Sequence, residues 1–596
     1  MSENVAVDTK TVESSELSQT LAEIASKSQQ LVQDFLKREQ NAHHISVHDA
    51  LHMSQLFQQL SARMMSNPMA LMQAQMTFWQ DYLALVQNAT LRMLGVRPEP
   101  VIAPKKGDKR FQHESWEENP VFDFIKQSYL LAAEYLHSTV KNIEGLDPKR
   151  ARQVEFYTRA FVDAMAPSNF IHTNPEVLRA TLETRGQNLL NGLKNLLDDL
   201  SRGSVKMTDL DAFEVGKNVA ISPGEVIYQN DLIQLIQYTP STDKVYKRPL
   251  LFIPPWINKF YIADLQPENS LVKYIVDQGF TLFMISWKVP KKEDAERGYE
   301  DYMTDGVFKA MEVVLAETGE KDLNAIGYCL GGTLLGSVLA YMSAKGDDRI
   351  KSAAYFTTLL DFSDPGDVEV FIDELQVKSL EERMNRTGYL DGRNIAVTFN
   401  MLRANDLIWQ YFINNYLHGK EPFPFDLLYW NSDATNMPAK MHSFYLRNMY
   451  LRNALREPGG ITLLGEPIDL RKIKIPTCFV STKEDHIAPW KTTYEGVNLH
   501  SGPTKFILGG SGHIAGVMNP PAKKKYFYWT NDGGRKIADP DKWLEKAEKY
   551  PGSWWPEWSK WAADKSGTQV AARKPGANKF KPIEPAPGSY VKERIV

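Results

Sequence analysis

The chain has 596 residues, of which 43% are hydrophobic and 24% are charged, the composition of an ordinary globular protein. Its formal net charge of −4 excludes the strongly basic footprint of a nucleic-acid-binding protein, so we expect no nucleic acid partner. The sequence has no run of eighteen apolar residues and no apolar core near its start, so we expect neither a transmembrane segment nor a signal peptide. Two cysteines, Cys329 and Cys478, are too few for a disulfide framework and indicate a cytoplasmic protein.

Residues 1–204 are predicted to form a mostly helical domain, of which 1–110 is a candidate mobile part. One amphipathic helix is indicated by apolar residues at steps of three and four, namely Met69, Met72, Met76, Trp79, Leu83 and Val86. This face either packs into a helical core or contacts a partner or an apolar polymer, because methionine adapts to irregular surfaces.

A histidine stripe lies in the same region, at His44, His48 and His52. Such a stripe can bind metal, but no carboxylate or cysteine completes a set of ligands, and we interpret it as a solvated helix face. We therefore predict no metal site and no cofactor.

Residues 205–596 change to short apolar runs that alternate with amphipathic stretches. Such runs fit buried parallel strands, and the helix-like segments between them give the βαβ pattern of a doubly wound, mostly parallel sheet. The strand candidates are Pro249–Pro254, Thr281–Trp287, Leu323–Gly327, Ala353–Thr358, Thr477–Ser481 and Thr504–Leu508. A gap of about 110 residues without a strand candidate ends near Leu470. We predict that residues 362–470 are a cap inserted over the carboxyl edge of the sheet, where α/β folds bind ligands.

The sequence Gly327-Tyr328-Cys329-Leu330-Gly331 follows a strand candidate and precedes a helix start. This is the nucleophile-elbow pattern of the α/β-hydrolase fold, with cysteine in place of serine. The glycines are needed because the nucleophile lies on a strained turn, where side chains two places away would collide with the backbone. The helix start also brings free N–H groups and a positive dipole to the sulfur. We predict that Cys329 is a nucleophile; a small buried core cysteine is the alternative, although such a turn is a poor place to bury one.

Two further residues lie where the fold requires the rest of a catalytic triad. Asp485 comes four residues after the run Thr477–Ser481, and His513 follows the run Thr504–Leu508 in a glycine-rich loop. The chain order of nucleophile, acid and histidine is that of α/β-hydrolases. We predict that Asp485 is the acid, with the adjacent Glu484 as its alternative, and that His513 is the base rather than a structural histidine.

Oxyanion donors are expected from two backbone N–H groups. One belongs to Leu330, directly after the nucleophile, and the other to the loop after Pro249–Pro254. Prolines lack an N–H, so Trp256 or Ile257 is the first candidate in that loop, and we select Ile257. Losing one such donor typically costs about 3 to 4 kcal/mol of transition-state stabilisation.

Several longer strings closely resemble the class I polyhydroxyalkanoate synthases, the poly(3-hydroxyalkanoate) polymerase family. They are GYCLGGT at 327–333, PPWINK at 254–259, EDHIAPW at 484–490, SGHIAGVMNPP at 511–521, FTTLLDF at 356–362 and YWNSDATN at 429–436. The resemblance runs from about residue 110 to the C-terminus. It implies an acyltransferase that polymerises (R)-3-hydroxyacyl groups from coenzyme A (CoA) thioesters into a polyester and releases CoA. On that resemblance Cys329 carries the acyl chain and His513 is its base, while Asp485 orients His513 or helps to deprotonate the incoming hydroxyl.

The resemblance also implies a homodimer that acts on a growing polyester chain at the surface of cytoplasmic granules, where granule-surface proteins are candidate partners. Trp430 resembles a residue linked to activity in the family, with core packing as the alternative interpretation. Ala515, two places past His513, is expected to line the substrate region. Lys523, Lys524 and Lys525 are either a phosphate contact for CoA or a solvated charge run.

Two other classes of function remain as alternatives. A hydrolase, either a polyester depolymerase or a thioesterase, would use the same three residues with water as the second nucleophile; a cysteine favours transfer. A non-catalytic granule-coat protein would use the methionine-rich helix as its working surface, and an intact Cys/Asp/His set argues against it.

Overall fold

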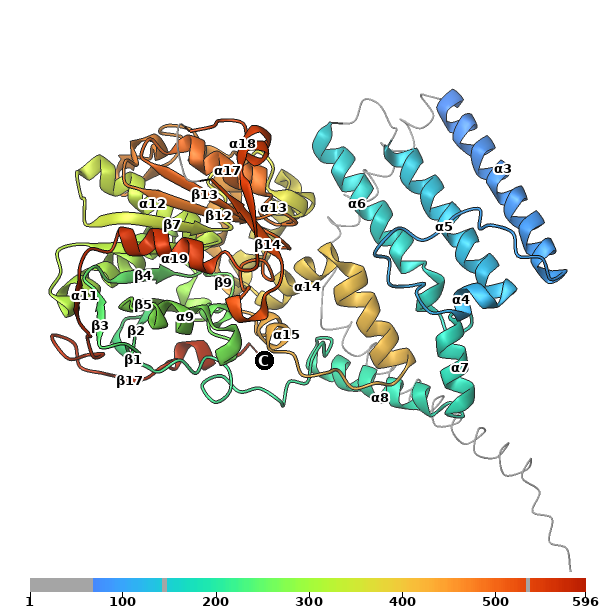
Figure 1. The fold of residues 1–596 in the computed structure, drawn as a ribbon, viewed down its shortest axis with the longest axis horizontal. Helices are drawn as coiled ribbons and strands as arrows, with labels where there is room; N and C mark the ends of the chain where they lie inside the picture. The colour runs from blue at the N-terminus through green and yellow to red at the C-terminus, as the bar shows by residue number, and fades with distance from the viewer. Residues whose placement is uncertain (1–67, 142–146, 532–535, 596) are drawn as a thin grey trace, which may run out of the picture. The chain divides into compact units, whose positions relative to one another are not determined.

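The computed structural model describes residues 68–141, 147–531 and 536–595, so the histidine stripe lies outside the described residues. The chain divides into two compact units (Figure 1). We call the first the helical unit; it comprises the described residues up to Asp209 together with Thr398–Phe423. The second, the sheet unit, comprises Leu210–Val397 and Pro424–Val596.

The helical unit is built from helices whose ends carry recognisable caps. Asp147 accepts a hydrogen bond from the Arg150 N–H at the start of α6, and Asn174 accepts from two N–H groups at the start of α7. In both helices a proline occupies the first helical position, where its missing N–H costs nothing. The helices are α3 (Pro68–Met93), α4 (Ser115–Glu118), α5 (Pro120–Lys141), α6 (Pro148–Ala164), α7 (Pro175–Glu183) and α8 (Gln187–Arg202).

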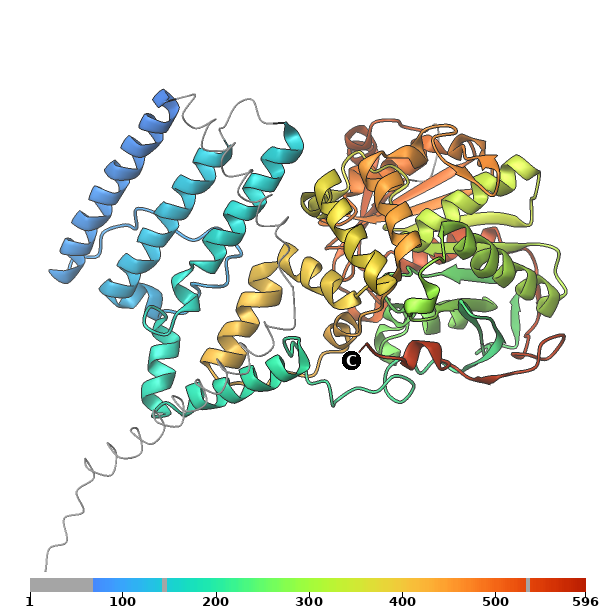
Figure 2. The same ribbon diagram turned by 180° about the vertical axis from the view of Figure 1, so that it is seen from behind.

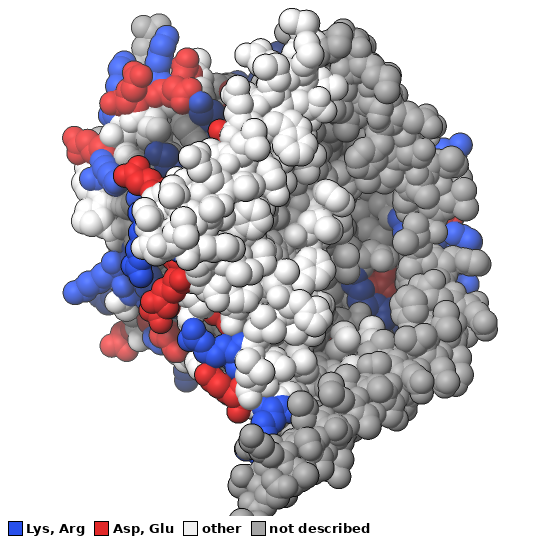
Figure 3. Space-filling view, turned by 90° about the vertical axis from the view of Figure 1, so that its right-hand side faces the viewer, with Lys and Arg blue, Asp and Glu red and all other residues white. Residues whose placement is uncertain are grey.

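Helix α3 has one packed face and one exposed face. Phe78 packs on Tyr135 of α5, with ring centroids 5.2 Å apart, and Leu85 is buried. The predicted apolar stripe lies on the other face, where all six side chains are 40–69% exposed. Figure 3, which faces this side of the chain, shows a broad uncharged surface. Of the two interpretations, a packed core does not describe this stripe. No helix among the described residues, α3 included, is long and apolar enough to cross a membrane.

Part of the predicted cap belongs to the helical unit. Within Thr398–Phe423, the π-helices η7 (Asn405–Trp409) and η8 (Phe412–Leu417) join this unit, and η8 packs on α8. The Tyr416 hydroxyl donates to Asp199 Oδ2 at 2.7 Å, and Asn188 Nδ2 donates to the Leu417 carbonyl at 2.8 Å. The backbones approach so closely that a Cβ atom at Gly192 would lie 1.8 Å from the Tyr416 carbonyl oxygen. Residues 362–470 are therefore divided between the two units, and their role as a cap stays a prediction.

The rest of the insertion stays in the sheet unit. It includes the helical segments η6 (Gly366–Phe371), α13 (Glu374–Thr387), α15 (Asp426–Ser432), α16 (Ala439–Tyr445) and the π-helix η9 (Leu446–Leu451). α14 (Gly392–Leu402) contains the boundary between the units. Buried side chains of α13, α16 and η9 belong to the same hydrophobic core cluster as the elbow helix described below.

Eleven strands of the described residues form one sheet. Its six central strands, from β13 to β5, are parallel, and all six correspond to predicted strands. The strands on both flanks are antiparallel and were not predicted. The order across the sheet is β15 (Glu548–Pro551), β14 (Phe527–Thr530), β13 (Thr504–Gly509), β12 (Thr477–Thr482), β7 (Ile350–Phe356), β6 (Leu323–Tyr328), β4 (Leu250–Ile253), β5 (Leu282–Trp287), β2 (Ile233–Tyr238), β1 (Gly224–Gln229) and β17 (Glu584–Pro585).

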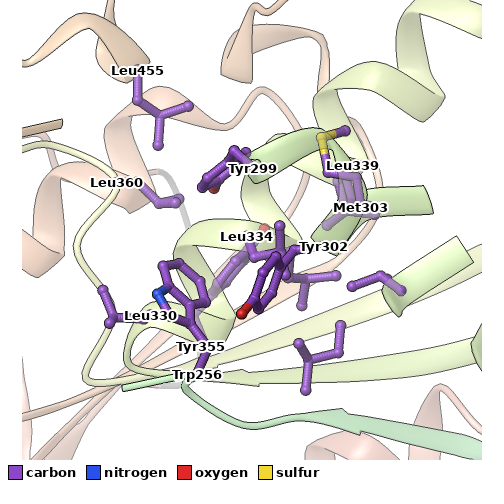
Figure 4. Close-up of a cluster of buried hydrophobic side chains, with 14 of the residues drawn as sticks. Trp256, Tyr299, Tyr302, Met303, Leu330, Leu334, Leu339, Tyr355, Leu360 and Leu455 are labelled. Carbon is purple, nitrogen blue, oxygen red and sulfur yellow. The ribbon is translucent and has the colours of Figure 1, made fainter. Parts of the chain in front are cut away.

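Helices cover both faces of the central strands, which explains why those strands are continuously apolar. Successive side chains of β4 point to opposite faces: Leu251 and Ile253 join one buried cluster, whereas Leu250 and Phe252 join the other. The first cluster, part of which Figure 4 shows, includes α11 (Lys309–Thr318), α12 (Leu330–Lys345) and α17 (Trp490–Leu499). The second includes α9 (Leu271–Asp277) and α19 (Trp555–Asp564), and Figure 2 gives the opposite view of the fold from Figure 1.

The chain reverses its direction of travel across the sheet at β4. From β4 the chain continues to β5 on one side, and the next parallel strand, β6, lies on the other side of β4. In open α/β sheets the crevice at the carboxyl ends of two such strands is the usual place for a ligand. The predicted elbow begins at the carboxyl end of β6, directly at this crevice.

Candidate active site

The predicted elbow has the backbone geometry that its sequence requires. Cys329 joins β6 to α12 with φ 50° and ψ −120°, a conformation that side-chain-bearing residues rarely adopt. Its N–H donates to the Phe356 carbonyl at 2.8 Å, and its carbonyl accepts from the Thr358 hydroxyl at 3.2 Å. These bonds to the end of β7 hold the strained turn, and they leave the Cys329 side chain half-buried.

The glycines of the elbow are required by close approach of the backbone. A Cβ atom at Gly327 would lie 2.4 Å from Gly332 Cα. A Cβ atom at Gly331 would lie 2.1 Å from the Ile253 carbonyl oxygen and 2.7 Å from that of Pro254. All three distances are too short for a real Cβ atom, so the elbow fits only with glycine at these two positions. The second contact also places the end of β4 directly against the elbow.

Asp485 and His513 come together from the loops after β12 and β13. His513 Nδ1 lies 2.7 Å from Asp485 Oδ2, and both side chains are buried. The other carboxylate oxygen, Oδ1, accepts from the N–H groups of Ile487 and Ala488 at 2.9 and 2.8 Å. Glu484, the alternative acid, is exposed. Asp485 is thus the carboxylate that pairs with His513.

His513 connects this carboxylate to the cysteine. Its side chain is hydrogen-bonded to Asp485 and interacts with Cys329. Burial lowers the pKa of His513, but the interactions with Asp485 and Cys329 outweigh burial and raise the pKa well above its ordinary value. The arrangement therefore favours an imidazolium that lies between a carboxylate and a sulfur.

Two tryptophans of the α19 region hold the histidine loop. The indole N–H of Trp554 donates to the Gly516 carbonyl at 2.9 Å, and that of Trp555 donates to the Val517 carbonyl at 2.8 Å. Ala515 lies half-buried in the turn between His513 and these anchors. His513 is therefore positioned by residues about forty positions further along the chain.

The predicted oxyanion donors lie on either side of the contact between β4 and the elbow. Leu330 is the first residue of α12, where a backbone N–H has no partner within the helix. In the loop after β4, Ile257 is half-buried, and no hydrogen bond within the described part of the chain occupies its N–H. Trp256 is buried against Tyr299 and Tyr445 (Figure 4 shows Trp256 beside Leu330).

Trp430 lies in α15 and is 4% exposed. Its indole N–H donates to the Lys259 carbonyl at 2.8 Å, at the end of the loop after β4. Trp430 thus packs in the core and also contacts the loop that carries Ile257, so its two interpretations do not exclude each other.

Sequence reasoning missed two tyrosines that interact with Cys329. Tyr445 ends α16 and Tyr450 lies in η9, and the centroids of their rings lie 5.4 Å apart. Burial raises the pKa of both hydroxyl groups, and their interaction with Cys329 acts in the same direction. Both hydroxyls therefore remain protonated donors beside the thiol. The insertion carries no motif that could have identified them, although a π-helix often marks a functional position.

The remaining predicted positions are three lysines and the second cysteine. Lys523, Lys524 and Lys525 are exposed around η12 (Pro521–Lys523). Cys478 is buried in β12, where burial raises the pKa of its thiol, as expected of inert packing. Among the described residues, no group of three His, Cys, Asp or Glu side chains could hold a metal ion.

Two protein families match the sequence. The model of the poly-beta-hydroxybutyrate polymerase (PhaC) N-terminus matches residues 107–275, and that of the alpha/beta hydrolase fold matches residues 248–520. The second match and the strand order together confirm the predicted α/β-hydrolase fold.

Curated proteins match most of the chain. The poly(3-hydroxyalkanoate) polymerase of Methylorubrum extorquens is 49% identical over 533 residues, which cover 89% of this chain and 88% of that protein. The poly(3-hydroxyalkanoate) polymerase subunit PhaC of Rhizobium etli is 46% identical over 90% of this chain and 85% of its own length. The corresponding subunit of Cupriavidus necator is 44% identical over 82% of this chain and 83% of its own length.

Proposed function

Because the chain belongs to the poly(3-hydroxyalkanoate) polymerase family, we propose that it joins (R)-3-hydroxyacyl groups from CoA thioesters into a polyester and releases CoA. The observation that carries this proposal is the Cys329 side chain at a hydrolase elbow, where it interacts with a histidine that is itself paired with Asp485. Family membership confirms the resemblance found in the sequence; the class I label stays a prediction.

In the loading step, the Cys329 thiolate attacks the thioester carbonyl of the substrate. The developing oxyanion is stabilised by the N–H groups of Leu330 and Ile257, which lie on the two sides of the elbow contact. CoA then leaves as a thiolate and takes a proton from His513. Because one thioester replaces another, this step changes the free energy little.

In the transfer step, a hydroxyl group attacks the acyl carbonyl on Cys329. His513 takes the hydroxyl proton as the oxygen attacks, and Asp485 stabilises the resulting imidazolium. The new bond is an oxoester, which is more stable than the thioester it replaces, so chain growth is downhill. The sulfur leaves as a thiolate beside the His513 imidazolium, which restores the starting state.

Exclusion of water decides whether such an acyl-enzyme polymerises or hydrolyses. We propose that the insertion, residues 362–470, covers the elbow for this purpose. Its part in the sheet unit supports this role, because Phe362, Tyr445 and Tyr450 pack together and both tyrosines interact with Cys329.

We propose further that the protein acts as a homodimer on granule surfaces in the cytoplasm, as the resemblance implies. The exposed apolar stripe of α3 supports contact with an apolar polymer, because its methionine, tryptophan and leucine side chains are uncovered along about five helix turns. Ala515 and Trp430 are proposed to affect substrate handling, the first beside His513 and the second through the loop after β4.

A hydrolase remains the alternative, because the same triad can pass the acyl group to water. The test is to follow CoA release from (R)-3-hydroxybutyryl-CoA and to analyse the products by solvent extraction and mass. We expect CoA in stoichiometric amounts with insoluble polyester, loss of both in Cys329→Ala, and full activity in the matched control Cys478→Ala. Free 3-hydroxybutyrate without polymer would show that the protein is a hydrolase and not a synthase.

A further inference from the structure

The loop after β4 ends at a buried lysine whose ammonium group has a full set of partners. Lys259 Nζ donates to Asp433 Oδ1 at 2.6 Å, to the Val591 carbonyl at 3.0 Å and to the Glu593 carbonyl at 2.6 Å. An ammonium group has three N–H donors, so these three acceptors satisfy it completely. The side chains of Lys259 and Asp433 are only 4% and 1% exposed.

Asp433 is satisfied as completely as the lysine. Its second oxygen, Oδ2, accepts from the Tyr261 hydroxyl at 2.9 Å, so both ends of the carboxylate hold the chain that follows the loop. Arg594 Nε lies 3.8 Å from Asp433 Oδ1, and the Arg594 guanidinium lies 4.4 Å from the centre of the Tyr429 ring. The last described residues of the chain are thus fastened to the loop after β4.

A buried ion pair of this kind contributes little net stability to a fold, because the free energy of removing both charges from water offsets their attraction. Burial lowers the pKa of Lys259, and the attraction of Asp433 only opposes this effect. Apolar residues of similar volume often replace buried ion pairs without loss of stability, whereas a pair with hydrogen bonds at fixed angles defines one geometry. The ion pair therefore indicates that the residues it joins must be held in one fixed geometry.

The segment that must be held in place lies between two backbone carbonyls, each of which accepts a hydrogen bond from a tryptophan. At its start, the Trp287 indole N–H donates to the Pro254 carbonyl at 2.9 Å, and at its end the Trp430 indole N–H donates to the Lys259 carbonyl at 2.8 Å. Ile257 lies between these two carbonyls, and the start of the segment touches Gly331 of the elbow. A shift of the Lys259 end would move the Ile257 N–H relative to the sulfur.

We propose that Lys259, Asp433 and the C-terminal tail, residues 591–594, are positioning elements that keep the Ile257 N–H aimed at the oxyanion. This inference rests on the proposed function, since it needs an acyl-transfer step at Cys329. The chain end thereby acts on the rate of acylation through the Lys259 ammonium, and Trp430 acts on the same loop through the Lys259 carbonyl.

Two reactions of the same cysteine separate this role from general stability. Attack on a thioester creates an oxyanion, whereas alkylation by iodoacetamide displaces iodide and creates none. The variants are Lys259→Met, deletion of residues 591–596, and Trp430→Phe, which removes one N–H and keeps an aromatic ring. The control is Lys291→Met, which breaks an exposed ion pair to the Glu593 side chain of the same tail.

We expect single-turnover acylation by (R)-3-hydroxybutyryl-CoA to slow about 10- to 100-fold in Lys259→Met and in the deletion, since complete loss of a donor costs 100- to 1,000-fold. Trp430→Phe should slow acylation less, by about 3- to 10-fold, because the Lys259 ammonium still holds the loop. In each variant the KM should stay near the wild-type value, and Cys329 should be alkylated at the wild-type rate. Lys291→Met should match the wild type in both reactions.

Unchanged acylation in all three variants, or a parallel fall of acylation and alkylation, would overturn the inference. Should the first two variants not fold, the result for Trp430→Phe decides, because that substitution leaves the ion pair intact. The wild-type reaction separates this inference from the proposed function. If wild-type Cys329 is alkylated but is never acylated, the proposed function fails; if wild-type Cys329 is acylated and the variants match it, only the positioning role fails.

Discussion

The nucleophile elbow and the loop after β4 touch each other, but they are held in place in different ways. The elbow depends on glycines within a few positions of Cys329 and on the end of the neighbouring strand β7. The loop depends on Trp287, on Trp430 and, through Lys259, on a carbonyl 334 positions away in the sequence. The first kind of support appears in the sequence as a motif, whereas the second becomes visible only when the chain is folded.

Of the following substitutions, Asp485→Asn, close to the elbow, should have the largest effect on activity. An amide cannot stabilise the imidazolium and favours the wrong tautomer of His513, so kcat should fall about 1,000- to 10,000-fold. Circular dichroism and the melting temperature should stay close to those of the wild type. The matched control is Glu484→Gln at the exposed neighbouring position, which should retain full activity; equal losses in the two variants would contradict the assignment of the acid.

Gly331→Ala should break the contact between the two regions. The new methyl group would lie 2.1 Å from the Ile253 carbonyl oxygen, so backbone must move, at a cost of about 3 kcal/mol or more in the free energy of unfolding. Urea denaturation measures this directly. Gly298→Ala is the control, because its Cβ would meet only Lys440 at 3.6 Å. A Gly331→Ala variant as stable as this control would mean that the elbow does not press against β4.

Asp264→Asn, a few residues beyond the loop after β4, should have a smaller effect on the free energy of unfolding, and this effect should depend on pH. Burial raises the pKa of Asp264 to about 6, although hydrogen bonds from Ser222 and Ser270 lower it. A raised carboxyl pKa gives stability that is present below the unfolded pKa near 3.8 and is lost as the pH rises through 6. Asparagine resembles the protonated form, so the variant should gain about 2 to 3 kcal/mol relative to the wild type between pH 4 and 7.

Urea denaturation at several pH values between 4 and 7 tests this prediction. Asp277→Asn serves as a control of opposite sign, because the pKa of this exposed carboxyl is lowered, with hydrogen bonds from Lys273 and Ser241 outweighing burial. A difference between Asp264→Asn and wild type that does not change with pH would show that Asp264 is ionised in the folded protein.

The sequence predicted a strand or a site residue correctly where a single local feature of the sequence determines it. Buried parallel strands are continuously apolar, so all six were predicted, with β7 displaced by three residues at its start. The antiparallel strands at the edges were missed, because they are short or carry polar residues, as in β15 (Glu548–Pro551), which is exposed throughout. The pairing of Asp485 with His513 could be predicted because the fold fixes the order of these residues after successive strands.

Other parts of the site depend on contacts between distant residues and could not have been predicted from one sequence. The pairing of Lys259 with Asp433 joins two residues that carry no motif together. Tyr450 interacts with the cysteine from a π-helix that begins directly after Tyr445, and apolar periodicity in the sequence does not predict a π-helix. Similarly, periodicity identified the apolar face of α3 but could not show that this face is exposed, because buried and exposed apolar stripes have the same period.

The central claim is that Cys329 carries the acyl chain, and the most direct test is to find that chain. The wild-type protein is mixed with (R)-3-hydroxybutyryl-CoA, quenched with acid within the first turnovers, digested and mapped by mass spectrometry. We expect the peptide that contains Cys329 to carry one or more 3-hydroxybutyryl units in thioester linkage, and the same peptide of Cys329→Ala to carry none. Acyl groups on another residue, or turnover that persists in Cys329→Ala, would contradict the account.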